Sequence, residues 1–136
     1  MAFVPPSRPA FSKRQNDQLG RRAEAWCRLF LRLKGYRILT QRHRGERGGS
    51  WGEIDILAHR GHVLAVIEVK ARRNAASHDL IAPRQQRRLI QAARAWLSAH
   101  PQHAADTIRF DLMHVIHRPG LWPSIRHISN AWQEDV

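Results

Sequence analysis

The stretch from residue 52 to residue 72 constrains the fold more than any other part of the chain. It reads GEIDILAHRGHVLAVIEVKAR, with two apolar runs on either side of the polar link HRGH. Gly61 in this link can adopt the positive φ that tight hairpin turns need, so the two runs are predicted to be adjacent antiparallel strands. They nevertheless carry three acids, Glu53, Asp55 and Glu68, together with Lys70. Isolated charges are costly to bury unless they are paired or bind a metal, so the hairpin either faces water on one side or holds a cation.

Side chains alternate across a strand, so the pairing register decides which of these charged residues share a face. A two-residue turn at 60–61, or a four-residue loop around it, would place Glu53 opposite Glu68 and Asp55 opposite Val66. All three acids and the lysine then lie on one face of the sheet. A link of odd length would instead send Asp55 and Glu68 to opposite faces.

Three carboxylates beside one lysine repel one another, and they need either shifted pKa values or a divalent cation to hold them together. Their hard oxygen atoms suit Mg²⁺ or Mn²⁺. A magnesium ion held by one or two carboxylates keeps several waters, which phosphate oxygens can replace. The acids therefore predict a metal site that acts on phosphate groups. For Glu53, pairing with an arginine is an alternative to metal ligation.

The charge of the chain indicates the class of partner. It carries 23 Lys and Arg against 11 Asp and Glu, a formal net charge of +12. Such a surplus suits a polyanion. No segment has the long basic amphipathic pattern of a helix that lies on a membrane, so nucleic acid is the expected partner, with DNA preferred to RNA. A small acidic pocket within a basic surface is what a metal-dependent nuclease needs.

A length of 136 residues fits one domain. We expect this domain to span 14–132, after a flexible basic arm at 1–13 and before a tail at 133–136. Apolar periodicity and turn residues predict helices over 16–34 and 83–100, and strands over 35–41, 107–116 and 124–132 in addition to the hairpin. The order α-β-β-β-α-β, with one further strand, predicts an α/β fold in which helices flank a mixed central sheet.

The setting of the protein is expected to be the cytoplasm. Cys27 is the single cysteine, so the chain forms no internal disulfide and a reducing compartment fits. The apolar runs are too short to span a bilayer, and the first residues lack the apolar core of a signal peptide. Cys27 lies at the apolar rim of the first predicted helix and is interpreted as a core residue.

Arginines are predicted to form the nucleic-acid-binding surface. The second helix has an arc of arginines opposite its apolar side, and it directly follows the strand that carries Glu68 and Lys70. The segment 42–50 reads as a flexible basic loop. The expected contacts are Arg42, Arg44, Arg72, Arg73, Arg84, Arg87 and Arg88.

Histidines are scattered along the chain. His59 and His62 flank the hairpin turn, but an H-x-x-H pattern without cysteines or a third ligand nearby is a weak zinc signal. We therefore interpret both as surface turn residues. His127, in the last predicted strand, is expected to make a structural hydrogen bond.

An acid on the first helix, then GEIDILA, then VIEVKAR, resembles the D-x(n)-E-x-K core of the restriction-endonuclease-like superfamily, with the acidic helix seen in Holliday-junction resolvases. More closely, six segments resemble successive landmarks of the YraN-type family of small bacterial endonuclease-like proteins. These segments span roughly residues 17–132 and read GRRAEAWCRLFLRLKGYRIL, GEIDILA, IEVKARR, PRQQRRL, RFDL and RHISNAW. The resemblance implies a restriction-endonuclease-like core.

The resemblance also implies roles for individual residues. Asp55 and Glu68 match the metal-binding acids, Lys70 matches the catalytic lysine, and Glu24 matches the acid of the first helix. Gln86 matches a polar residue that contacts phosphate or water in related nucleases.

The chain departs from the family pattern at two positions. Ala23 stands where the family usually has a glycine, and Gln85 stands where a lysine is common. Neither departure removes a metal ligand, but the second weakens any role for that helix position.

The expected activity is therefore metal-dependent hydrolysis of phosphodiester bonds. Two alternatives are a non-catalytic nucleic-acid-binding module of the same fold and a basic protein that binds a protein partner. A homodimer would suit the cutting of two strands, although no segment marks an interface.

Overall fold

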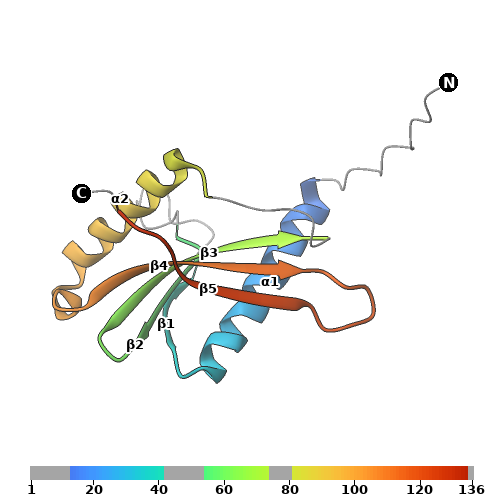
Figure 1. The fold of residues 1–136 in the computed structure, drawn as a ribbon, viewed down its shortest axis with the longest axis horizontal. Coiled ribbons are helices and arrows are strands. Elements are labelled where there is room, and N and C mark those ends of the chain that lie inside the picture. Colours follow the sequence, from blue (N-terminus) through green and yellow to red (C-terminus); the bar gives the residue numbers. More distant parts are fainter. Residues whose placement is uncertain (1–12, 42–53, 74–80, 135–136) are drawn as a thin grey trace.

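The computed structural model describes residues 13–41, 54–73 and 81–134. A five-stranded sheet has the strand order β1-β2-β3-β4-β5, in which β3 and β4 are parallel and the other neighbours are antiparallel (Figure 1). The elements are α1 (Lys13–Leu33), β1 (Arg37–Gln41), β2 (Ile56–Arg60), β3 (Val63–Arg72), α2 (Pro83–Ala99), the short 3₁₀ helix η2 (Pro101–His103), β4 (Thr107–Ile116) and β5 (Ser124–Trp132). The predicted α/β fold with a mixed sheet is confirmed.

Each face of the sheet is covered by one helix, which gives three layers (Figure 1). On one face, Cys27 and Leu31 of α1 pack with sheet residues such as Ile67. On the other face, Leu89 and Trp96 of α2 pack with residues of β2, β3 and β4. Alternate residues of β3 go to opposite cores, as the period of two in a strand requires. Both faces of the inner strands are therefore apolar, and any acid on them stands out.

The end of α1 follows from a glycine, as predicted. Gly35 has a φ of 90°, a left-handed conformation that glycine adopts without strain. Its N–H bonds to the carbonyl of Arg32, and the Tyr36 N–H bonds to the carbonyl of Leu31. This is a Schellman motif, completed by two buried side chains, Leu31 and Tyr36. The motif turns the chain directly into β1.

The hairpin between β2 and β3 differs from the prediction by two residues. The turn is at Gly61 and His62, not at 60–61, and Gly61 takes a φ of 61°. Leu57 therefore lies opposite Val66, so the predicted pairing of Asp55 with Val66 is wrong. Side chains alternate between the two faces of a strand, so a shift of two residues changes which residues lie opposite each other. It leaves every side chain on the face that was predicted.

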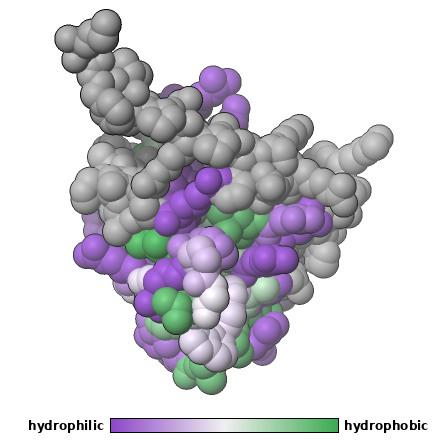
Figure 2. Space-filling view, turned by 90° about the vertical axis from the view of Figure 1, so that its right-hand side faces the viewer, coloured by the Kyte–Doolittle hydropathy of each residue, from purple (hydrophilic) through white to green (hydrophobic). Residues whose placement is uncertain are grey.

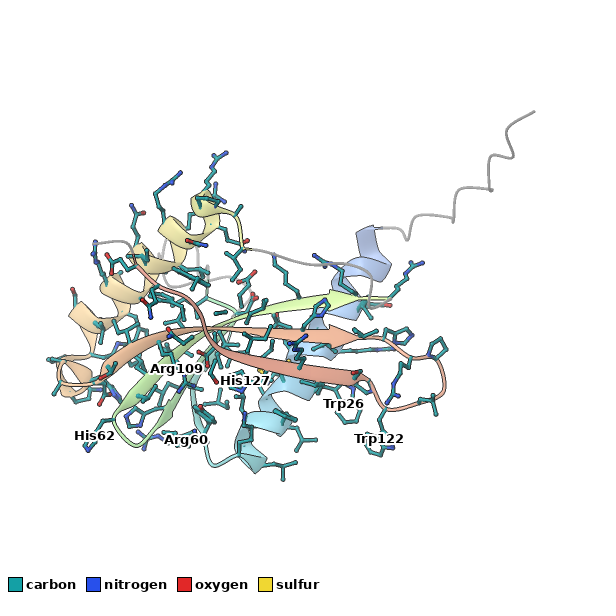
Figure 3. The ribbon with its side chains drawn as sticks, in the orientation of Figure 1. Trp26, Arg60, His62, Arg109, Trp122 and His127 are labelled. Atoms are coloured by element: carbon teal, nitrogen blue, oxygen red, sulfur yellow. The ribbon has the colours of Figure 1, made fainter. Side chains whose placement is uncertain are left out.

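A buried charged network joins β4 to β5. Asp111 is fully buried, and it accepts hydrogen bonds from both the Nε and Nη2 atoms of Arg109 at 2.8 Å and from the Asn130 N–H at 2.9 Å. His127 Nε2 lies 2.8 Å from the same carboxylate, which confirms its structural role, and Figure 3 shows Arg109 and His127 converging. Arg109 also bonds to the Tyr36 hydroxyl at 2.5 Å, so the network reaches the start of β1.

The pKa of Asp111 shows that the network holds a charged carboxylate. Burial alone would raise this pKa, but the hydrogen bonds from His127, Arg109 and the Asn130 N–H outweigh it and bring the pKa down to about 2. Asp111 is thus ionised at neutral pH inside the core. Removing the Asp111 carboxylate would leave Arg109 and His127 without the acceptor that they share.

Candidate active site

Acids from two neighbouring strands meet at one end of β2. Asp55 immediately precedes β2, and Glu68 lies on β3. Both are buried, with exposed fractions of 7% and 6%. The Asp55 Oδ2 atom accepts a hydrogen bond from the Val69 N–H at 2.9 Å, so its carboxylate is fixed against the β3 backbone just beyond the last paired residue of β2. The structure thus brings Asp55 and Glu68 together.

Lys70 and a glutamine of α2 complete this cluster. Lys70 is two residues after Glu68 and on the same side of β3, and its Nζ lies 3.4 Å from Glu68 Oε1. Gln85 donates from Nε2 to Glu68 Oε1 at 2.6 Å and accepts from Lys70 Nζ at 3.4 Å. The three side chains form a closed triangle. Gln85 is the residue that the sequence reasoning set aside, because it stands where the family has a lysine.

The surroundings of Glu68 favour its protonated form. Burial is the main cause that raises the pKa of Glu68 to about 7, and the negative charge of Asp55 adds to it, while Lys70 opposes it. The Oε2 atom of Glu68 is buried and accepts no hydrogen bond from any residue that the structure describes. A side-chain hydrogen bond between Glu68 and Asp55 also favours the protonated form of Glu68.

Helix α1 brings a third acid to the same neighbourhood. Cys27 is fully buried, and burial is the main cause that raises its pKa to about 12; the negative charges of Glu24 and Asp55 add to the rise. Both carboxylates therefore lie close to this one thiol. Cys27 is a core residue, as predicted, and Glu24 is half-buried on α1. Glu53 lies outside the described residues.

The donor set fits a hard divalent cation. Asp55 and Glu68 offer carboxylate oxygens, one of which has no partner among the described residues, and Glu24 is near. If Mg²⁺ or Mn²⁺ binds here, Asp55 and Glu68 would hold it. Such an ion polarises phosphate oxygens and lowers the pKa of a bound water. The role of these acids as ligands stays a prediction.

The arginines predicted to contact nucleic acid lie in two groups. Arg84, Arg87 and Arg88 are exposed on α2. Arg72 ends β3 and Arg73 follows it, and with Lys70 they line an open hollow of about 490 Å³ that Leu19 and Gly20 of α1 also line. Figure 2 views the molecule from this end, where hydrophilic side chains surround smaller hydrophobic areas. The two remaining arginines, Arg42 and Arg44, lie outside the described residues.

The two neighbouring glutamines of α2 have different surroundings. Gln86, which the resemblance associates with phosphate or water, donates its amide to the Ile81 carbonyl at 2.9 Å. It also lines a surface hollow with Arg87. Gln85 instead reaches Glu68 and Lys70. The geometry therefore assigns the contact with the acidic cluster to Gln85.

Two tryptophans, Trp26 and Trp122, lie at the same end as the hollow (Figure 3). Trp122, in the connection between β4 and β5, is 72% exposed, and its ring lies edge-on to Trp26 at 4.9 Å (Figure 3). Exposed aromatic rings are platforms on which bases stack. The hydrophobic residue Leu121 beside it is also exposed.

Glu68→Gln is expected to remove a pH dependence of stability. A carboxyl group whose pKa is 4.5 in the unfolded chain and about 7 in the folded protein binds its proton more tightly when folded. It therefore stabilises the fold at low pH, and this stabilisation is lost as the pH rises through about 7. Without divalent cations, urea unfolding between pH 5 and pH 8 should show the wild type losing up to about 3 kcal/mol more than Glu68→Gln. Equal pH profiles would contradict the raised pKa.

This arrangement, a mixed sheet between helices with two acids and a lysine on adjacent inner strands, defines an α/β protein with a restriction-endonuclease-like core. The chain belongs to the uncharacterised protein family UPF0102, the YraN-type family that its motifs resemble, and residues 23–115 match this family.

Relatives that match most of the chain support the same assignment. The chain is 44% identical to a UPF0102 protein of Parvibaculum lavamentivorans over 117 residues, which cover 85% of this chain and 82% of the relative. It is 37% identical to a UPF0102 protein of Paramagnetospirillum magneticum over 136 residues, which cover 99% and 100%. Within the described residues, no helix has the length and apolar character needed to cross a membrane.

Proposed function

We propose that this protein binds nucleic acid and hydrolyses phosphodiester bonds with the help of Mg²⁺ or Mn²⁺. One observation carries the proposal. Two buried carboxyl groups, Asp55 and Glu68, lie together beside Lys70, with the pKa of Glu68 raised to about 7 and one of its oxygens without a hydrogen-bonding partner among the described residues. Buried carboxyl groups with a raised pKa beside a lysine are typical of functional sites, and a bound cation would stabilise the ionised form of both acids.

Asp55, Lys70 and Gln85 would each have a separate role in the proposed hydrolysis. Asp55 is fixed by the Val69 N–H, so its carboxylate cannot swing away from the pair. Lys70, held by Glu68 and Gln85, can position a water or offset the negative charge that develops on the scissile phosphate. Gln85 orients Glu68 and Lys70 at once. The protein thus supplies fixed ligands, a fixed ammonium group and a residue that sets their geometry.

The surface charge is suited to hold the substrate. Arg72 and Arg73 lie in the same hollow as Lys70, and the exposed arginines of α2 follow Gln85 along the helix. Contacts of this kind recognise the phosphate backbone rather than base sequence. We therefore propose a nuclease selective for the structure of its substrate rather than for its sequence. DNA as the substrate, a homodimer and a cytoplasmic setting stay predictions.

A non-catalytic nucleic-acid-binding module is the second candidate. The arginines at the end of β3 and along α2 favour it as much as they favour a nuclease, since phosphate contacts need no chemistry. The two candidates differ in whether the acidic pair acts on the bound phosphate.

Cleavage of labelled substrates tests the proposal. The wild type should be incubated with branched, flapped, duplex and single-stranded DNA, and with the RNA counterparts, in Mn²⁺, in Mg²⁺ and in EDTA. We expect cleavage of at least one substrate class with Mn²⁺ and none with EDTA. Binding without cleavage under every condition would favour the second candidate, and cleavage in EDTA would contradict the proposed chemistry.

A further inference from the structure

Three metal-ligating side chains meet at the end of the sheet remote from the acidic pair. His59 lies near the end of β2, His103 ends η2, and Asp106 directly precedes β4. Asp55 stands at the other end of β2, four residues before His59, which corresponds to about 13 Å of extended strand. The cluster is therefore separate from the candidate active site.

The three side chains already point at one another. Asp106 Oδ2 lies 2.7 Å from His103 Nδ1 and 3.1 Å from His59 Nε2. Taking one ligand atom from each residue, all three lie within 4.8 Å of one another. In a tetrahedral zinc site with bonds of about 2.0–2.1 Å, the ligand atoms lie about 3.3 Å apart. Shifts of about an ångström would thus convert the cluster into three corners of such a site.

The surroundings favour a bound ion over a simple hydrogen-bonded cluster. His59 Nε2 is buried and makes no hydrogen bond of ordinary geometry within the described residues, although Asp106 is near. His103 is 8% exposed, and the ring of Trp96 packs against it at 5.2 Å. One carboxylate oxygen thus lies against a nitrogen of each of two imidazoles.

We propose that His59, His103 and Asp106 bind Zn²⁺, with the fourth coordination position open. Two imidazoles and one carboxylate suit zinc far better than the hard ion Mg²⁺. The ion would clamp the end of β2 to the connection between η2 and β4, which are far apart in the sequence. The interpretation of His59 as a surface turn residue is wrong, because its ring faces inward; His62 is exposed at the hairpin tip, as predicted (Figure 3).

Zinc titration of the metal-free protein tests this site. In millimolar Mg²⁺, added to occupy the acidic pair, calorimetry and equilibrium dialysis should show one bound Zn²⁺ per chain for the wild type. His59→Ala should weaken binding by at least about 100-fold, because losing a ligand exceeds the 10–100-fold cost of losing its outer partners. His62→Ala, in the same hairpin, should bind as the wild type does. Co²⁺ should give the visible absorption of a tetrahedral site in the wild type and lose it in His59→Ala.

Two further variants keep the result unambiguous. Asp106→Asn preserves the shape of the side chain, so it replaces His59→Ala if that variant does not fold, and it should weaken Zn²⁺ to a similar degree. Asp55→Asn should leave Zn²⁺ binding unchanged, which separates this site from the candidate active site. Absence of Zn²⁺ binding by the wild type, or equal weakening in His59→Ala and His62→Ala, would overturn the proposal.

Discussion

Replacing Asp111 by alanine is expected to lower the free energy of unfolding by about 3–5 kcal/mol, the usual cost of removing one partner from a buried ion pair. The free energy of unfolding falls because the partners of Asp111 stay in the core without it. Arg109 and His127 lose their shared carboxylate, and the Asn130 N–H loses its acceptor. Urea unfolding at pH 7 measures the change. Asp111→Asn keeps an acceptor oxygen but no charge, so it should cost less than Asp111→Ala.

An exposed ion pair provides the matched control. Glu134 pairs with Arg94 on the surface, where both side chains reach water. Glu134→Ala should therefore change the free energy of unfolding by less than about 1 kcal/mol. If Asp111→Ala costs no more than Glu134→Ala, the network is not what joins β4 to β5.

Replacing Lys70 by alanine is expected to lower the rate of phosphodiester cleavage by about 10²–10³-fold, the range found when one group that stabilises developing negative charge is removed. The single-turnover rate in Mn²⁺ at saturating protein measures this change separately from binding. Lys70 is half-buried and lies at the surface hollow, so its loss should leave the fold intact. Affinity for the substrate should fall far less than the rate.

The two neighbouring glutamines supply the control for this series. Gln85→Ala breaks the contacts with Glu68 and Lys70 and should slow cleavage by about 10-fold or more, as the loss of an orienting partner does. Gln86→Ala removes only a bond to the Ile81 carbonyl and should have a smaller effect on the rate. Cleavage that survives Lys70→Ala at the wild-type rate would show that another protein or another mechanism is responsible.

Local signals in the sequence predicted the elements well. Strand β4 runs from Thr107 to Ile116 and β5 from Ser124 to Trp132, as predicted, because apolar runs bounded by turn residues set both ends. Helix α1 ends just before Gly35, as predicted, because this glycine adopts the positive φ that ends a helix. The hairpin register was wrong by two residues because the sequence does not say whether Gly61 is the first or the second residue of the turn. Asp55 and Glu68 nevertheless lie together, as predicted, because a register shift of two residues leaves both side chains on the same face of the sheet.

Contacts between distant segments could not be read from the sequence. Asp111 stands in an apolar strand, and that signal was present, but its partners His127 and Asn130 come from β5, and the network extends through Arg109 to Tyr36. Gln85 and Gln86 are adjacent, and only the orientation of α2 against the sheet decides which one reaches Glu68. The partners of His59 come from a segment more than 40 residues away.

The most direct test of the central claim, that Asp55 and Glu68 hold a divalent cation, is a titration of thermal stability with Mg²⁺. A ligand that binds only the folded protein adds about 2.7 kcal/mol at a concentration 100 times its Kd, so the melting temperature of the wild type should rise steadily with Mg²⁺. Asp55→Asn, compared with its own metal-free state, should show little of this rise, while Asp106→Asn should show all of it. An equal rise in the wild type and Asp55→Asn, or none in the wild type, would contradict the account.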